Sequence, residues 1–574
     1  IRAGTLDLVL GEGNELTLEK QIPIEDEEGM SLDGFTFSLT NNGNIESDYT
    51  IYLDDIALDE GESRIPDSSI RYSLTRNEEV FMTRNMTTMG SNPNRRVDFG
   101  TIGVDETINY TLRIWIDYDA TKEEASGKTF KGKLRVVATQ PVGEEVSTVL
   151  LDNIPKENQY DDGIDTFITG EDPNNYIWYS GKLWRAVSIN NTENTVKLVT
   201  QWNISAIPYN ASGNPAFEGS YMESWLNDTT VDGFLGNLRD YENFIVIDSV
   251  WNATMDSNDL GNIERPNGTT TVTTPVGLLN IYEYQSSNNG GVYGYLNNGL
   301  DWWCITPYNS TNVRSITFIG AVNNGAPSAA FGIRPSINLK SNVKIVDGDG
   351  TVDNPYRLSG DNDTDLSGTL LNTRYSGEYI TFGNDENNLY RIVSRETEGL
   401  TKITSAEPLK SSGAFKTMEF DSNNNANYSS TNTIGAFLNG EYLVSYVDSG
   451  YRNMIEDNTI WYLGTVRGYA SYKLAKYTDE TGNTLTSNIT SATIGLLRMG
   501  ELMAGQFDKY NNNTFYWTLT LYDFYVRSVN TNGASTGTSP VLAGVKPSIN
   551  LKSNVVITGG DGTKENPFTL ELAD

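Results

Sequence analysis

The chain has 574 residues, of which 37% are hydrophobic and 11% aromatic, and its formal net charge is −34. This length allows three or four domains, because one hydrophobic core seldom serves more than about 250–300 residues. The aromatic content excludes a disordered chain. The negative charge excludes a nucleic-acid-binding protein, because such proteins depend on Lys and Arg contacts to phosphate.

The sequence contains no His and one Cys, Cys304. Ser and Cys nucleophiles normally need a His base. Glycoside hydrolysis needs only two carboxylates, but we find no Asp/Glu pair at equivalent places in the internal repeat described below. We therefore expect that the protein is not an enzyme and needs no cofactor or metal.

The beginning of the chain and its hydropathy bear on localisation. The first residues read Ile1-Arg2-Ala3-Gly4, without an initiator Met. We interpret this start as a mature product whose signal peptide has been removed, and we expect an extracellular protein. No apolar run approaches the roughly 20 residues of a membrane-spanning helix, so we expect no transmembrane segment.

Residues 1–150 show the alternation of apolar and polar residues that is typical of β-strands. The strongest stretches are separated by Gly, Asn and Asp turns, and they cover residues 36–40, 49–53, 109–115 and 131–138. Regularly spaced strands with turn signals predict a β-sandwich or jelly roll. Residues 151–171, rich in Asp, Asn and Gly, are predicted to form a linker.

The first strand of this domain has one apolar face. Leu6, Leu8 and Leu10 alternate with polar Thr5 and with other residues that point to the opposite side. Such a strand fits two interpretations, which the sequence alone leaves open. It is either the ordinary first strand of its own sheet or a strand that is donated to the sheet of another subunit.

A long internal repeat dominates the rest of the sequence. Residues 332–358 read GIRPSINLKSNVKIVDGDGTVDNPYRL, and residues 544–570 read GVKPSINLKSNVVITGGDGTKENPFTL, at an offset of 212 residues. Weaker matches extend the repeat towards the N-terminus in the same order. We predict two homologous domains of α+β type in which strands predominate: copy 1 at 172–359 and copy 2 at 372–574, with a linker at 360–371.

Within copy 1, residues 182–187 and 195–200 alternate as strands, and residues 221–226 and 275–284 have the spacing of short helices. The run Asp347-Gly348-Asp349-Gly350 lacks the spacing of a calcium-binding EF-hand. It loses one carboxylate in copy 2, where it reads Gly559-Gly560-Asp561-Gly562. We interpret it as a turn between two strands.

Six aromatic and Arg residues are the candidates for a ligand-binding face, because aromatic rings stack on sugars or peptides and Arg adds directed hydrogen bonds. They are Trp302, Trp303 and Arg314 in copy 1 and Tyr516, Trp517 and Arg527 in copy 2. The alternative, which the sequence favours, is core packing of at least one ring in each pair.

The N-terminal domain resembles the TasA/camelysin family of Gram-positive extracellular filament proteins. The resemblance rests on Ala3-Gly4-Thr5-Leu6-Asp7-Leu8, on the run from Asn41 to Tyr49, and on Tyr110-Thr111-Leu112-Arg113-Ile114-Trp115. It implies a jelly-roll subunit that polymerises by donor-strand exchange through Thr5, Leu6, Leu8 and Leu10. Some camelysin relatives are described as metalloproteases, but a chain without His lacks the usual zinc ligands, so this activity is not carried over.

The duplicated domain resembles a repeat of unknown function that is common in secreted proteins of Firmicutes. The residues concerned are the Trp-Trp-x-x-Thr-Pro element at 302–307 and the Pro-Ser-Ile-Asn-Leu-Lys element of both copies. The same elements are similar to those of C-type-lectin-like and formylglycine-generating-enzyme folds. The enzyme version needs active-site cysteines, and Cys304 has only Thr518 as its counterpart.

These observations predict a structural subunit of an extracellular, pilus-like or biofilm-matrix filament. Its partners are identical subunits, and the duplicated domains serve display or adhesion. The alternative is a monomeric or cell-surface adhesin that binds glycan or protein through the duplicated domains. A carboxylate-based glycan hydrolase is the third hypothesis.

Overall fold

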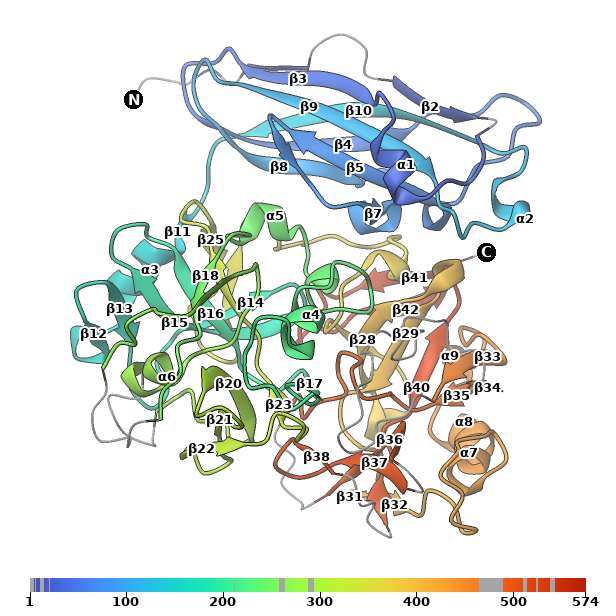
Figure 1. Ribbon diagram of the computed structural model, residues 1–574. Coiled ribbons are helices and arrows are strands. Elements are labelled where there is room, and N and C mark those ends of the chain that lie inside the picture. The colour runs from blue at the N-terminus through green and yellow to red at the C-terminus, as the bar shows by residue number, and fades with distance from the viewer. Residues whose placement is uncertain are drawn as a thin grey trace. The chain divides into compact units, whose positions relative to one another are not determined.

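The computed structural model describes residues 5, 7–10, 15–19, 21–210, 212–257, 264–287, 294–463, 489–508, 514–522, 525–536 and 542–573. The chain divides into two compact units (Figure 1). The first unit comprises residues 1–143, 367–374 and 397–399, and the second unit comprises the rest. Strands predominate over helices, which confirms the predicted mainly β fold.

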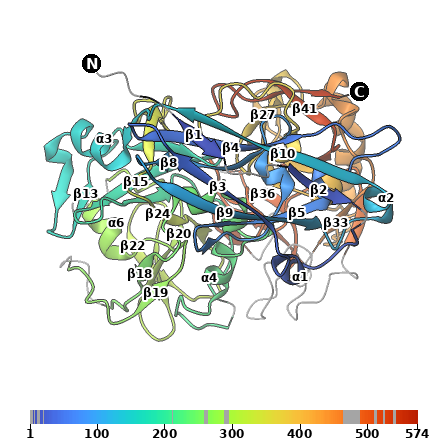
Figure 2. The same ribbon diagram turned by 90° about the horizontal axis from the view of Figure 1, so that it is seen from above.

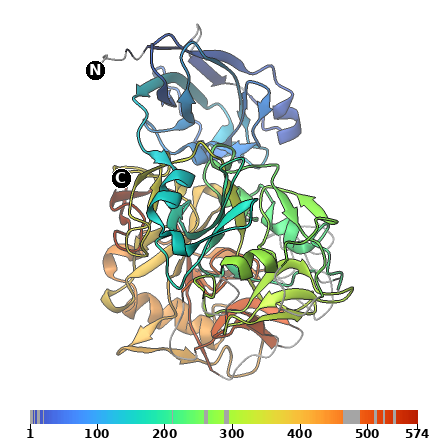
Figure 3. The same ribbon diagram turned by 90° about the vertical axis from the view of Figure 1, so that its left-hand side faces the viewer.

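The first unit is a β-sandwich in which two sheets share one hydrophobic core (Figure 3). One sheet contains, in order, β1 (Leu8–Leu10), β3 (Phe35–Asn41), β9 (Thr107–Ile116), β5 (Ile70–Arg76) and β6 (Glu79–Val80), with β7 (Arg84–Asn85) also paired to β5. The other contains β2 (Glu15–Glu19), β10 (Thr129–Thr139), β4 (Ser47–Asp55) and β8 (Arg96–Ile102). Short helices α1 (Asp26–Met30), α2 (Lys122–Ala125), η1 (Asp67–Ser69) and η2 (Met86–Met89) connect these strands.

The predicted alternation accounts for this sandwich. All four strands expected in residues 1–150 are present as β3, β4, β9 and β10. In β3, Phe37 and Leu39 are buried between the sheets, whereas Thr36 is exposed. Successive long strands lie in opposite sheets, so each connection crosses the sandwich and both sheets contribute to one core.

In the second unit, copy 1 is built on a large sheet and a small one. The large sheet contains, in order, β11 (Glu144–Glu145), β25 (Lys344–Asp347), β26 (Tyr356–Leu358), β14 (Tyr176–Tyr179), β15 (Lys182–Asn190), β13 (Asp165–Ile168) and β12 (Gln159–Asp161). In addition, β16 (Val196–Thr200) pairs with β15, and β24 (Ser336–Leu339) pairs with β16. The small sheet contains β17 (Ser205–Ala206), β23 (Gly332–Ile333), β20 (Trp302–Pro307), β21 (Val313–Ile316) and β22 (Val322–Gly325). Hairpin β18 (Val250–Asn252) with β19 (Thr271–Thr273) and helices α3 (Val146–Asn153), α4 (Tyr221–Leu226), α5 (Tyr241–Phe244) and α6 (Ile281–Ser287) complete it.

Copy 2 repeats this plan. One sheet contains β27 (Tyr379–Thr381), β28 (Leu389–Arg395), β29 (Thr401–Ser405), β40 (Ser548–Leu551) and β35 (Ile494–Gly495), and the other contains β32 (Thr417–Met418), β39 (Ala543–Gly544), β36 (Tyr516–Tyr522), β37 (Tyr525–Val529) and β38 (Ser535–Thr536). The hairpins are β30 (Lys410–Ser411) with β31 (Ala414–Phe415), β33 (Thr459–Tyr462) with β34 (Ile489–Ala492), and β41 (Val555–Gly559) with β42 (Thr569–Leu572). The helices are α7 (Thr433–Phe437), the π-helix η8 (Leu438–Tyr442), α8 (Leu443–Ser445) and α9 (Ser449–Arg452).

The two copies match down to the irregularities of their strands. The pairing of β15 with β16 shifts register between Ala186 and Ser188. The pairing of β28 with β29 shifts between Ile392 and Ser394, which are the same repeat positions. A β-bulge is a specific local structure, so its recurrence shows that the two segments align residue by residue.

The copies also pack against each other within the second unit. The Trp178 ring stacks on that of Tyr379 at 6.2 Å between centroids. The indole Nε1 of Trp225 in α4 donates to the carbonyl of Gly500 in copy 2 at 2.8 Å. The two copies therefore share buried surface.

The observed boundaries differ from the predicted ones. Residues 151–171, predicted as a linker, contain β12 and β13, and β13 pairs with β15 in the large sheet of copy 1. Residues 367–374 and 397–399, predicted as linker and copy 2, belong to the first unit. Polar and Gly-rich composition indicated a connection, but strand pairing depends on residues far away in the chain.

The helix predictions are confirmed for α4 and are shifted for α6. The predicted helix over 275–284 begins only at Ile281. Asn280 and Glu283 cap each other: the backbone N–H of Glu283 donates to Asn280 Oδ1, and that of Asn280 donates to Glu283 Oε2, both at 2.9 Å. The preceding Gly277 instead forms an antiparallel bridge with Ser336.

Candidate functional site

The first candidate site is the N-terminal strand. β1 lies at the edge of its sheet and pairs antiparallel with β3 (Figure 2). In this pairing Leu8 lies opposite Asn41 and Leu10 lies opposite Leu39. Leu8 and Leu10 are partly buried against the sandwich core, whereas Val9 points outward and is 46% exposed. The predicted apolar face of the strand therefore faces the core.

The pairing continues beyond β1 towards the N-terminus. The backbone N–H of Asn42 donates to the carbonyl of Asp7 at 2.8 Å, and that of Asn44 donates to the carbonyl of Thr5 at 3.2 Å. The N–H of Thr5 donates to Asn44 Oδ1 at 2.8 Å. Leu6, the remaining predicted donor residue, lies outside the described residues.

The turn at Asn41–Asn44 lies opposite the N-terminal segment and allows its close approach. The buried side chain of Asn41 donates to the carbonyls of Ile45 and Ile102, and its Oδ1 accepts from the N–H of Gly43. A Cβ at Gly43 would lie 2.2 Å from the carbonyl oxygen of Thr5, so only glycine permits this approach. The Asn41–Asn44 run is therefore a docking turn for the N-terminal segment.

The six residues predicted as a ligand face are all buried. Trp302 and Trp303 have no exposed surface, and Arg314, Tyr516, Trp517 and Arg527 are at most 6% exposed. Trp303 Nε1 donates to the carbonyl of Ile207, and Trp517 Nε1 donates to that of Met418. These side chains cannot present a surface to a glycan or protein, because both faces of β20 and β36 are covered.

The Arg residues of this set pack on neighbouring rings. The guanidinium carbon of Arg314 lies 4.3 Å from the ring centroid of Tyr308, and Arg527 lies at the same distance from Tyr522. Such cation–π contacts are stabilising when they are desolvated. In each copy the two aromatic residues and the Arg of the predicted ligand face are therefore part of the packed interior.

A charged cluster that the sequence patterns did not indicate recurs in both copies, largely buried in copy 1 and buried in copy 2. In copy 1, Lys197 Nζ lies 2.6 Å from Glu283 Oε1 and 4.5 Å from the ring of Trp251. In copy 2, Lys402 Nζ lies 2.9 Å from Glu501 Oε1 and 5.1 Å from the ring of Trp461. The available signal was a Lys on a buried strand at the same repeat position.

The tryptophan of each cluster is fixed by its hairpin and by a glycine. Trp251 Nε1 donates to the carbonyl of Thr274, and Trp461 Nε1 donates to that of Ala492. A Cβ at Gly277 would lie 2.3 Å from the Trp251 ring, so this position allows no larger residue. In copy 2 one lysine faces two carboxylates, because Glu396 Oε1 also lies 3.5 Å from Lys402 Nζ, and a buried cluster of this kind depends on all its charged members.

The Gly-Asp runs form turns, in agreement with their interpretation from the sequence. Asp349 Oδ1 accepts hydrogen bonds from the N–H and hydroxyl of Thr351, and Asp561 Oδ1 accepts the same pair from Thr563. These hydrogen bonds from Thr351 lower the pKa of Asp349. Each turn joins the two strands of a hairpin, β25 to β26 in copy 1 and β41 to β42 in copy 2.

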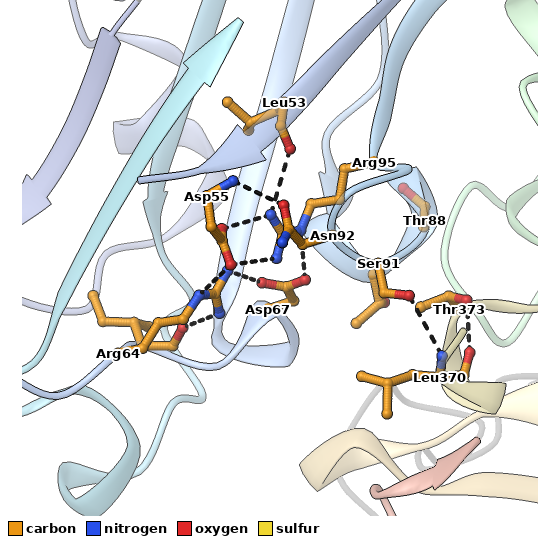
Figure 4. Close-up of polar contacts among 12 residues, drawn as sticks. Leu53, Asp55, Arg64, Asp67, Thr88, Ser91, Asn92, Arg95, Leu370 and Thr373 are labelled. Atoms are coloured by element: carbon orange, nitrogen blue, oxygen red, sulfur yellow. Dashed lines mark hydrogen bonds and ion pairs between the residues drawn. The ribbon is translucent and has the colours of Figure 1, made fainter. Parts of the chain in front are cut away.

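The first unit contains a closed ring of two Asp and two Arg residues (Figure 4). Asp55 Oδ1 lies 3.0 Å from Arg64 Nη2 and 2.7 Å from Arg95 Nη1. Asp67 completes the ring, with Oδ1 2.6 Å from Arg64 Nη2 and Oδ2 2.7 Å from Arg95 Nε. The ring ties the end of β4 to η1 and to the residue that precedes β8.

The same part of the first unit receives the segment 367–374. The N–H of Leu370 donates to Ser91 Oγ at 3.4 Å, and the Thr373 hydroxyl donates to the carbonyl of Leu370 at 2.7 Å (Figure 4). Beside them, the Asn92 side chain accepts from the N–H of Asp55 at 2.8 Å. This polar layer therefore organises one end of the sandwich.

Comparisons with models of known protein families, with characterised proteins and with solved structures gave no match for this chain. No described helix is long and apolar enough to cross a membrane. Function therefore has to be argued from the geometry of the chain itself.

We expect that Lys402→Met destabilises the second unit by about 3–5 kcal/mol, because the change leaves buried carboxylates without a counter-charge. Lys402 and Glu501 are only 8% and 6% exposed, and Glu396 lies 3.5 Å from the same lysine. Urea unfolding measures the effect. The matched control is Lys410→Met, whose side chain and that of its partner Glu407 are 33% and 44% exposed, so that the pair contributes about 0–1 kcal/mol. Equal losses in both variants would contradict the interpretation.

From the Asp–Arg ring we expect the first unit to lose stability at acid pH. Burial raises the pKa of Asp55, but hydrogen bonds from Arg95 and Arg64 outweigh burial and lower the pKa overall. A carboxyl with a lowered pKa stabilises the fold above its unfolded pKa of about 3.9, and this contribution is lost as pH falls through the folded pKa.

We therefore expect that Asp55→Asn costs about 1–3 kcal/mol at pH 7 and costs less as the pH falls below about 4. The measurement is the urea midpoint of the first unit between pH 7 and pH 3. Asp33→Asn, at an exposed position, is the control for the loss of one negative charge. A pH-independent difference between the wild type and Asp55→Asn would refute the proposed ionic role.

Proposed function

We propose that the chain is a structural subunit of an extracellular filament, pilus-like or part of a biofilm matrix, assembled by exchange of the N-terminal strand. The observation that carries this proposal is the position of β1. It fills part of the sandwich core with Leu8 and Leu10, yet it pairs with a single neighbour at the edge of the sheet. A strand so placed makes identical contacts in its own subunit or in the next one.

Exchange of such a strand is β-augmentation between identical chains. Backbone hydrogen bonds to β3 and the docking turn at Asn41–Asn44 are the same in both arrangements, so their free energies cancel. The balance then depends on protein concentration and on the connection to β2. That connection contains Gly11 and Gly13 in the sequence, and glycine tolerates the change of direction that exchange requires.

In this proposal the duplicated domains serve display or adhesion, and no enzyme activity or cofactor is assigned. The alternative is a monomeric or cell-surface adhesin that binds glycan or protein through the duplicated domains. The six residues considered for its ligand face are buried, so they give this alternative no support. The filament is therefore the function that the described geometry favours.

A cysteine pair distinguishes a strand kept in its own sheet from an exchanged one. Val9 and Thr40 are cross-strand partners with outward side chains. Oxidation of the double variant Val9→Cys/Thr40→Cys should give covalent ladders on a non-reducing gel when the protein is concentrated. Cys304 is fully buried and does not interfere. Monomeric bands alone, from material at the highest concentration, would refute exchange.

The matched control is Ser38→Cys/Asn109→Cys, a cross-strand pair between β3 and β9 that stays within one subunit. This variant should give only monomers at every concentration. Electron microscopy completes the test: filaments of the intact chain should be absent after removal of residues 1–11. Because the net charge is −34, subunits repel one another, and added salt should promote assembly.

A further inference from the structure

Arg334 is a buried charge at the junction of β23 and β24. Its side chain is fully buried. Burial and the nearby Arg185 guanidinium lower the pKa of Arg334 to about 9, so the side chain still carries its charge at neutral pH. An isolated charge in a protein interior is costly unless an opposite charge or strong hydrogen bonds compensate it.

The protein groups that hold Arg334 are neutral. Its Nε donates to the carbonyl of Thr200 at 2.8 Å, and its Nη1 donates to the carbonyl of Leu296 at 2.6 Å. The guanidinium carbon lies 4.7 Å from the ring of Trp302. Across the described ranges of the chain, Nη2 finds no acceptor and no carboxylate forms an ion pair with this side chain.

Trp302 presents a second unused donor at the same place. Its Nε1 is buried and donates to none of the residues that the structure describes. Buried N–H groups almost always have an acceptor. Two unused donors on side chains that contact each other therefore indicate an acceptor that the protein does not itself provide.

The surrounding side chains do not supply negative charge. The hydroxyl of Tyr284 donates to the carbonyl of Gly320 at 2.7 Å, and that of Tyr295 donates to the carbonyl of Ala186 at 2.9 Å. Burial raises the pKa of the Cys304 thiol, so the thiol is neutral. The guanidinium carbon of Arg185 lies 4.7 Å from the Tyr295 ring, and its charge is paired with Asp172, whose Oδ1 lies 3.4 Å from Arg185 Nη1, so that this carboxylate is already engaged.

Copy 2 places carboxylates near the corresponding cation. The position of Arg334 is occupied there by Lys546, whose Nζ lies 5.0 Å from the ring of Tyr516, the counterpart of Trp302. Burial and the Arg391 guanidinium lower the pKa of Lys546 to about 7, and the carboxylates of Asp508 and Glu407 oppose this shift. In copy 1, the sequence from Tyr284 to Leu300 contains no Asp or Glu.

We propose that copy 1 binds a small monovalent inorganic anion, such as chloride, through Nη2 of Arg334 and Nε1 of Trp302. The donors suit an anion because they offer only N–H groups next to a positive charge. The site suits an ion of one or a few atoms, because both side chains are fully buried. The inference does not depend on filament assembly.

The first test is crystallography of the full chain refolded in sodium bromide without chloride. We expect an anomalous difference peak within hydrogen-bonding distance of Nη2 of Arg334 and Nε1 of Trp302. A map with no peak at this position, from crystals grown in bromide, would overturn the proposal. This test needs no variant and so does not depend on the folding of a mutant.

The second test is thermal unfolding at constant ionic strength, with sodium chloride replaced stepwise by sodium gluconate, whose anion is too large for the site. We expect the unfolding midpoint to rise with chloride, because a ligand that binds only the folded state stabilises it. Arg334→Met should abolish the rise, whereas Lys546→Met should retain it. A midpoint in the wild type that is the same in chloride and gluconate would count against the anion site.

Discussion

A lysine held between a carboxylate and an indole ring organises each copy of the duplicated region. Lys197 connects β16 to helix α6 through Glu283 and to the β18–β19 hairpin through Trp251. Lys402 makes the corresponding connections in copy 2. A buried charge without its partner costs several kcal/mol, so the members of the cluster depend on one another. This dependence explains why the cluster recurs while the loops around it differ in length.

Much of the architecture was predictable because it depends on patterns among residues that are close in sequence. The alternation in 36–40 and 49–53 predicted strands of the sandwich, and the repeated Pro-Ser-Ile-Asn-Leu-Lys segment predicted two homologous domains. The helix at α4 was found because its apolar spacing is local, and in the structure Ser220 caps it. In these places, residues close in sequence determine the structure.

The rest could not be predicted, because it depends on contacts distant in sequence. Strand neighbours normally point to opposite faces, so Trp302 and Trp303 suggested one exposed ring; both are buried because β20 is covered on each side. The polar composition of 151–171 hides the pairing of β13 with β15. The Lys402–Glu501 pair joins residues 99 positions apart. Only the fold reveals such partners.

The first unit is discontinuous in sequence, and this has a consequence for the order of events during synthesis. Residues 1–143 are made first, but residues 367–374 and 397–399 belong to the same unit. The last of these follows residue 143 by 256 positions (399 − 143). Domains generally fold from the N-terminus as the chain is made. The sandwich of this protein therefore completes its packing only after all of copy 1, and the beginning of copy 2, have been synthesised.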